Sequence, residues 1–433
     1  MNRKKFLATL GVLGLGAYTL YHNRAQGEPY SEYFHALNEK LKSEGSYKPS
    51  LIIDMDILDK NIEVLKSNLT VDYRIVVKSI PSANLVKYIM EKTSTKKLMM
   101  FHQPFINHMA KLVPDSDILL GKPMPVKAAE IFYKDLEGSF DPTTQLQWLV
   151  DTKERLVQYL ELSKKIGKKM LISLEIDVNM HRCNIREPEQ LDELFAIFKA
   201  NPQHIVFNGF MGYDGHVTNV PSFLEAPEKT YEKSITRYEE FIAYTKKNHS
   251  EFWREDLCLN GGGSPSITFH KDGRCINDVS ASSCLVKAYQ FDKDVLAEFQ
   301  PACFIATPIL KIMDGLNLPS LDFATKPLKF LAPNASKTYF TYGGKWMAKF
   351  ESPKGLSKSE AYGESTNQCI ACGDEKQNLK VDDYIFLRPY QSEFVFLQFG
   401  ALNLYRKGKP LERWDVLGQE SNPDIISPTT PTV

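Results

Sequence analysis

Lys78 is the residue best suited to attack a carbonyl compound. It follows residues 74–77, whose β-branched composition predicts a buried strand, and Ser79, Pro81 and Ser82 then favour the start of a helix. A lysine at the end of an apolar strand is poorly solvated, and desolvation favours the neutral, nucleophilic amine. A lysine that merely leaves the sheet for water is the alternative for this segment taken alone.

A glycine triplet supplies a candidate anion site. Asn260, Gly261, Gly262, Gly263 and Ser264 follow the seventh predicted strand and precede a short helical piece. Glycines let successive backbone N–H groups point at one anion, and a helix N-terminus adds its dipole. An ordinary glycine turn is the alternative. In β/α barrels, however, phosphate groups bind after strands seven and eight, so the position favours a phosphate site.

Two further strand ends carry side chains that suit a flat, charged ligand. Arg182 can hold a phenolate or a carboxylate, Tyr213 can pack its ring against a cofactor, and His216 can carry protons. A surface arginine and a structural histidine are the alternatives. An imine-forming lysine, a phosphate cradle and a cation for a phenolate together are what pyridoxal phosphate requires.

Alternating strands and helices must position these residues. The predicted strands are 74–78, 97–102, 117–121, 145–151, 169–177, 205–214, 256–262 and 278–286. The helices between them include 104–112, 126–135, 153–166, 187–200 and 221–248. This number of strand–helix units matches a TIM-type (β/α)8 barrel. An open doubly wound α/β sheet is the alternative, but reactive residues close strands all round the predicted barrel, not at one switch point.

The pattern changes after residue 300, where helical periodicity fades. Short strands are predicted at 304–312, 337–342, 384–387, 394–399 and 402–405, separated by glycine and proline turns. The sequence therefore predicts a barrel domain over residues 48–300 and a C-terminal β-rich domain over residues 301–420. The polar and aromatic zone 26–47 is expected to pack on the body of the protein.

The N-terminal segment predicts an export signal or a short membrane anchor over residues 1–25. Arg3, Lys4 and Lys5 precede an apolar run at 6–20, which is short for a hydrocarbon core. The positive-inside rule then places the body outside the cytoplasm, in the periplasm or tethered to the membrane through residues 6–20. A cytoplasmic protein with an apolar leader is the alternative.

Composition excludes some classes of protein. The 433 residues carry a formal net charge of zero, which gives no reason to expect a nucleic-acid partner. Hydrophobic residues make up 43% and charged residues 24%, as in soluble globular enzymes. Seven scattered cysteines argue against a disulfide framework.

The ordered motifs resemble those of alanine-racemase-type, fold-III pyridoxal-phosphate enzymes. Within them the sequence is similar to the branch of D-threonine aldolase and D-serine dehydratase, often described as amino acid deaminase/aldolase. The matching pieces are LIIDMD from Leu51, VVKS around Lys78, EIDVNMHRC from Glu175, GYDGH from Gly212, NGGGS from Asn260, STNQ from Ser365 and LRPYQSE from Leu387.

The resemblance implies a role for each matched residue. Lys78 would form an imine with the cofactor, Arg182 would contact its phenolate oxygen, and Tyr213 would lie by its pyridine ring. Gly262, Gly263 and Ser264 would hold the phosphate, with Asn260 and Gly261 beside them. The resemblance also implies a homodimer in which the β-domain closes a neighbouring active site.

One motif departs from that branch. Its aldolases and dehydratases bind a divalent metal through a histidine and a nearby Asp or Cys after an Asn-Gln pair. Here Cys369, Cys372 and Asp374 follow the pair and the histidine is missing. Cys-x-x-Cys can bind zinc, but no second pair is present, so the pattern favours two buried cysteines without a metal.

The resulting hypothesis is a lyase that acts on D-β-hydroxy amino acids through an imine on Lys78, by aldol cleavage or by dehydration and deamination. Lys78, Tyr213 and His216 are the candidate catalytic residues, and a small amino acid is the expected substrate. The alternatives are an amino-acid racemase, which needs a second base such as Tyr213 or a tyrosine of the β-domain, and a non-catalytic protein that binds pyridoxal phosphate.

Overall fold

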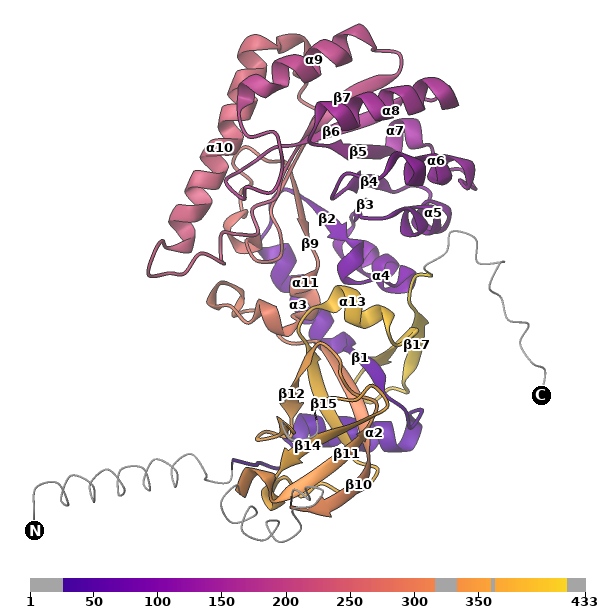
Figure 1. Cartoon of the computed structure of the whole chain (residues 1–433), viewed down its shortest axis with the longest axis vertical. Helices are drawn as coiled ribbons and strands as arrows, with labels where there is room; N and C mark the ends of the chain where they lie inside the picture. Colours follow the sequence, from indigo (N-terminus) through magenta and orange to yellow (C-terminus); the bar gives the residue numbers. More distant parts are fainter. Residues whose placement is uncertain (1–25, 316–332, 360–362, 419–433) are drawn as a thin grey trace, which may run out of the picture. The chain divides into compact units, whose positions relative to one another are not determined.

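The computed structural model describes residues 26–315, 333–359 and 363–418. These residues form two units, a closed parallel barrel and a mostly antiparallel sheet (Figure 1). The predicted leader, residues 1–25, lies outside the described residues. None of the helices described is long and apolar enough to cross a membrane.

Eight parallel strands close the barrel in chain order, which confirms the predicted TIM-type barrel. The strands are β2 (Asp72–Val76), β3 (Lys97–Met100), β4 (Asp117–Leu120), β5 (Leu146–Val150), β6 (Met170–Glu175), β7 (Ile205–Gly212), β8 (Cys258–Gly261) and β9 (Asp278–Ala281). Each overlaps the strand predicted for it. All carboxyl ends of a parallel barrel meet at one rim, so the side chains that follow these strands gather there.

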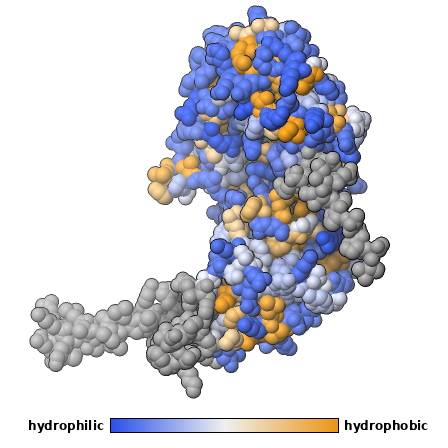
Figure 2. All heavy atoms as spheres, turned by 45° about the vertical axis from the view of Figure 1, so that its right-hand side comes forward, coloured by the Kyte–Doolittle hydropathy of each residue, from blue (hydrophilic) through white to orange (hydrophobic). Residues whose placement is uncertain are grey.

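Helices connect the strands and lie around the barrel (Figure 1). They are α3 (Met55–Ser67), α4 (Ala83–Thr93), α5 (Gln103–Leu112), α6 (Val126–Lys134), α7 (Pro142–Gln145), α8 (Lys153–Ile166), α9 (Leu191–Ala200), α10 (Pro227–Asn248) and α11 (Ser283–Val286). α8 shows why they begin and end where they do. The Thr152 side chain accepts a hydrogen bond from the Arg155 N–H, and Gly167 ends the helix in the left-handed conformation. The outside of this unit is mostly hydrophilic in the view of Figure 2.

A buried ion-pair network fills the barrel at the start of β2 and β9. Arg74 and Asp278 are both fully buried, and the guanidinium holds the carboxylate through Nε at 2.9 Å and Nη2 at 2.8 Å. Arg74 Nη1 also lies 3.2 Å from Asp117 Oδ1 on β4. This network ties three strands together at the end of the barrel opposite the rim.

The second unit is a nine-stranded sheet, as far as the chain is described. Its strands are β1 (Ser50–Asp54), β10 (Cys303–Asp314), β11 (Lys337–Tyr342), β12 (Ala348–Ser352), β13 (Ser357–Lys358), β14 (Gln368–Gly373), β15 (Tyr384–Pro389), β16 (Ala401–Tyr405) and β17 (Glu412–Asp415). Helix α2 (Glu32–Glu44) buries Leu37 and Leu41 against Ile52 and Phe386 of the sheet. The zone 26–47, expected only to pack on the body, thus contains a helix.

The units do not follow the predicted boundaries at 48–300 and 301–420. β1 pairs with β10 and so belongs to the sheet unit, whereas Gln391–Leu402 belongs to the barrel unit. The strand predicted at 394–399 is wrong, because α13 (Ser392–Leu397) occupies that segment. Ser392, Val395 and Phe396 are buried at helical spacing. The continuous apolar run 394–397 obscured this spacing in the sequence.

Candidate functional site

A cavity of about 300 Å³ opens at the carboxyl rim of the barrel. It brings together most of the site residues predicted from sequence, namely Lys78, Arg182, Tyr213, Asn260, Gly262, Gly263 and Ser264. The segments after β3 and β9 add Phe101, Ser282 and Ser283 to its wall, and helix α13 adds Glu393. The volume is at the lower end of the range for ligand pockets, which suits a cofactor and a small substrate.

Lys78 lies in a 3₁₀ turn, Val77–Ser79, directly after β2. Its Nζ is 2.9 Å from Oε1 of Glu393 and 4.5 Å from the centroid of the Phe101 ring. The side chain is 37% exposed, so the poorly solvated lysine expected from sequence is not what the structure has. A carboxylate partner holds the amine at the cavity instead.

The glycine loop after β8, residues 262–264, forms another part of the cavity wall. Gly262 has φ +77°, which favours glycine, and a Cβ on Gly263 would lie 2.8 Å from Cε2 of Tyr213. Ser264 Oγ accepts hydrogen bonds from the backbone N–H groups of Ser282 at 3.2 Å and Cys284 at 3.1 Å. The hydroxyl proton of Ser264 is then available to an anion. The loops after β8 and β9 together form one anion-binding surface.

Replacing Gly263 by valine is expected to weaken phosphate binding. The new side chain overlaps the Tyr213 ring, and overpacking of this kind costs about 1–3 kcal/mol, roughly a 10- to 100-fold weaker Kd. Titration of the purified variant with pyridoxal phosphate and with phosphate-free pyridoxal measures the effect. Equal losses for both ligands would show that the loop does not hold the phosphate.

Arg182 and Tyr213 stack on each other at the rim. The Arg182 Cζ lies 4.5 Å from the Tyr213 ring centroid, and Nη2 donates to Oε1 of Glu175 at 2.8 Å. Burial raises the pKa of the Tyr213 hydroxyl, with Arg182 opposing the shift and Asp214 adding to it. The phenol is therefore protonated at neutral pH.

Asn260 is part of the cavity wall, but its side chain is hydrogen-bonded to a neighbouring strand. Two other predicted residues lie outside the wall. The Asn260 side chain binds Asp278 Oδ1 at 2.5 Å and Ser280 Oγ at 2.8 Å, so it ties β8 to β9. Gly261 is not part of the cavity wall. His216 is not part of it either, and its Nε2 lies 3.2 Å from Ser234 Oγ on α10. Burial lowers the pKa of His216.

Sequence reasoning missed Glu393 as a site residue. The signal was present, because the matched segment from Leu387 ends on this glutamate. Helix α13, which occupies the segment predicted as a strand at 394–399, carries Glu393 to the cavity wall. Ser282 and Ser283 were missed because nothing in their residue types distinguishes them from a turn.

The proposed metal ligands do not converge. Cys369 and Cys372 lie three residues apart on β14, so their side chains leave opposite faces of the strand. The Asp374 carboxylate accepts from the N–H groups of Gly27 and Lys376, each at 2.8 Å. No group of three or more His, Cys, Asp or Glu side chains among the described residues can hold a metal ion. Cys369, Cys372 and Asp374 therefore do not form one ligand set.

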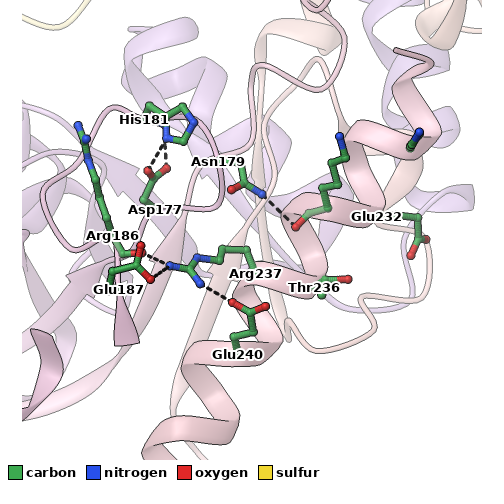
Figure 3. Close-up of a pocket in the computed structure, with 11 residues that line it drawn as sticks. Asp177, Asn179, His181, Arg186, Glu187, Glu232, Thr236, Arg237 and Glu240 are labelled. Atoms are coloured by element: carbon green, nitrogen blue, oxygen red, sulfur yellow. Dashed lines mark hydrogen bonds and ion pairs between the residues drawn. The ribbon is translucent and has the colours of Figure 1, made fainter. Parts of the chain in front are cut away.

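A larger hollow, of about 720 Å³, lies beside α10 (Figure 3). Several of its charged side chains are held in ion pairs: Arg237 binds Glu187 at 2.5 Å, and His181 Nδ1 lies 2.9 Å from Asp177 Oδ2 (Figure 3). It contains no glycine loop, and its lysines Lys229 and Lys233 lie along an open helix face. We therefore place the candidate site in the smaller cavity at the rim.

Comparisons with known proteins identify a family and a fold. A sequence profile of the alanine racemase N-terminal domain family matches residues 53–278. No curated protein sequence matches the chain.

Solved structures show the same fold at low identity. D-threonine aldolase from Filomicrobium marinum has a TM-score of 0.66 and 14% identity over 86% of this chain and 97% of that one. D-threo-3-hydroxyaspartate dehydratase from Delftia sp. HT23 has a TM-score of 0.65 and 13% identity over 86% and 98%. An alanine racemase from Bacillus anthracis has a TM-score of 0.61 and 14% identity over 85% and 97%.

Proposed function

Because the chain belongs to the alanine racemase N-terminal domain family, we propose that it is a pyridoxal-phosphate-dependent lyase of D-β-hydroxy amino acids. The observation that carries the proposal is the single cavity that holds the Lys78 amine and the Gly262–Ser264 loop. The names of the aldolase and dehydratase with the same fold support a reaction at the β-carbon.

The residues present fit pyridoxal phosphate. The Lys78 amine suits the aldehyde, and the loop at Gly262 and Gly263, which a side chain would fill, suits the phosphate. Arg182 offers a permanent positive charge for a phenolate, and Tyr213 offers a flat ring. When bound, the cofactor supplies an electron sink for the bonds at the α-carbon of an amino acid.

Residues of the chain would hold the cofactor and transfer protons. Ser264, whose Oγ accepts from the Ser282 N–H, would hold the phosphate with the Gly262–Gly263 loop, and Arg182, braced by Glu175, would orient the ring. Burial raises the pKa of Glu175, although Arg182 draws it back. The Lys78 amine is the group that gives or takes the proton at the α-carbon.

A racemase is the second candidate, favoured by the family profile and by the alanine racemase of the same fold. It needs a base on each face of the α-carbon. The raised pKa of Tyr213 counts against this tyrosine as the second base.

A screen of purified protein loaded with pyridoxal phosphate tests the proposal. We expect D-threonine or D-serine to give a carbonyl product and the L-enantiomers to give none. Parallel assays with EDTA and with added divalent metal report any metal requirement. Loss of optical rotation without product supports the racemase, and bound cofactor without either change supports a binding protein.

We further propose a homodimer and a body exported or anchored through residues 1–25. Light scattering of the purified protein tests the first proposal. A fusion of residues 1–25 to a reporter tests the second, and a reporter that stays in the cytosol contradicts it.

A further inference from the structure

The function proposed above leaves one proton without an acceptor. Aldol cleavage of the Cα–Cβ bond requires the β-hydroxyl to lose its proton, while Lys78 is engaged at the α-carbon. A second proton-transfer group is therefore needed at the cavity.

Glu393 is the only acidic residue among those that line the described cavity. Its Oε1 lies 2.9 Å from Lys78 Nζ, and its side chain is 37% exposed, so it is open to a substrate. Two carboxylates that contact or adjoin other residues of the site, Glu175 and Asp214, are buried and already hydrogen-bonded. Glu175 accepts from Arg182 at 2.8 Å, and Asp214 accepts from Ser266 Oγ at 2.5 Å and binds His270 Nε2 at 2.6 Å.

Helix α13 fixes the position of Glu393. Ser392, Val395 and Phe396 anchor the helix with buried side chains on one face. The preceding residue, Gln391, donates from Nε2 to Oε1 of Gln290 at 2.9 Å, which ties the start of the helix to the loop after β9. Glu393 is thus supported by packing on one side and by Lys78 on the other.

We propose that Glu393 is the catalytic residue that accepts the β-hydroxyl proton during cleavage of the Cα–Cβ bond. The O–H proton moves to the Glu393 carboxylate, and the electron pair left on oxygen forms the C=O bond of a departing aldehyde. The Cα–Cβ bond breaks with its electron pair left on the α-carbon. The Lys78 ammonium then gives its proton to that carbon.

The short contact between the two residues closes the cycle. After the reaction Glu393 is protonated and Lys78 is neutral, so one proton transfer between them restores the starting charges. A D-β-hydroxy amino acid is thereby converted to an aldehyde and glycine, with no net gain or loss of protons. This inference rests on the proposed lyase function and specifies aldol cleavage as its chemistry.

The test separates chemistry at the β-carbon from chemistry at the α-carbon in the loaded enzyme. Glu393→Gln is expected to lower aldehyde formation from D-threonine by about 10²- to 10⁴-fold. Exchange of the α-protons of glycine with deuterium oxide, followed by NMR, needs only Lys78 and is expected to persist. Glu393→Asp should recover part of the aldehyde formation.

Two further measurements keep the result interpretable. The Kd for pyridoxal phosphate and the Tm of Glu393→Gln are expected to match those of the unchanged protein. Glu130→Gln is the control, since it removes a carboxylate that pairs with Lys127 on the surface of α6. Undiminished aldehyde formation in Glu393→Gln, or an equal loss of exchange and cleavage, would overturn the assignment. Exchange without any aldehyde from the unchanged enzyme would instead contradict the lyase function itself.

Discussion

Replacing Lys78 by alanine is expected to abolish the covalent link to pyridoxal phosphate and to lower aldehyde formation by about 10²- to 10⁴-fold. The amine is the only lysine amine among the described residues that line the rim cavity, so no neighbour can take its place. Its loss removes both the attachment point and the group that serves the α-carbon. Absorbance of the bound cofactor and the rate of aldehyde formation measure the two effects.

Lys78→Arg separates charge from chemistry. Arginine preserves a positive charge beside Glu393 but cannot attack an aldehyde at neutral pH. We expect it to be as inactive as the alanine variant while keeping a similar Tm. Lys127→Ala, on the surface of α6, is the control and should load cofactor normally. Normal absorbance in either Lys78 variant would mean that another amine carries the cofactor.

Replacing Arg74 by methionine is expected to lower the free energy of unfolding by about 3–5 kcal/mol. Asp278 would be left fully buried without the guanidinium that binds both of its oxygens. Lys97 Nζ, at 3.0 Å from Asp278, compensates only in part. Urea denaturation of the two proteins measures the difference, and a loss well below this range would show that water or Lys97 replaces the arginine.

The loss of unfolding free energy in the Arg74→Met variant should also depend on pH. Burial alone would raise the pKa of Asp278, but Arg74 and Lys97 outweigh it and hold the pKa below its ordinary value. A depressed carboxyl pKa stabilises the fold above the unfolded value, about 3.9, and the stabilisation disappears as pH falls through the folded value. In the variant Asp278 can protonate instead. The gap between the two proteins is therefore expected to narrow in acid.

The sequence predicted the barrel well because its strands are largely buried and most are separated by an amphipathic helix. α8 begins and ends where its cap residues Thr152 and Gly167 require. The rim residues followed from the same pattern, since a parallel barrel brings all carboxyl strand ends together. Lys78, Arg182 and the glycine loop could therefore be assigned to one site without coordinates.

Other features depended on contacts that local patterns do not contain. β1 pairs with β10, more than two hundred residues away in the chain, so sequence order placed it wrongly in the barrel domain. The apolar run around Phe394 fits a strand or a helix equally well, and burial of Val395 and Phe396 decides for the helix. Glu393 belongs to the same helix and lines the rim cavity.

The contacts of individual polar side chains also could not be predicted from the sequence. His216 has a residue type that suits catalysis, yet its ring binds Ser234 on α10 instead of facing the rim cavity. Cys369 and Cys372 have the spacing of a metal pair, but that spacing brings ligands together in a turn and separates them on a strand. Motif spacing predicts a site only when the backbone conformation is also known.

Borohydride reduction of the loaded protein, followed by peptide mapping, tests the central claim most directly. Reduction fixes the cofactor to whichever amine holds it. We predict one labelled peptide, the one that contains Lys78. A label on another lysine, or no label on any peptide, would contradict the site and the reaction assigned to it.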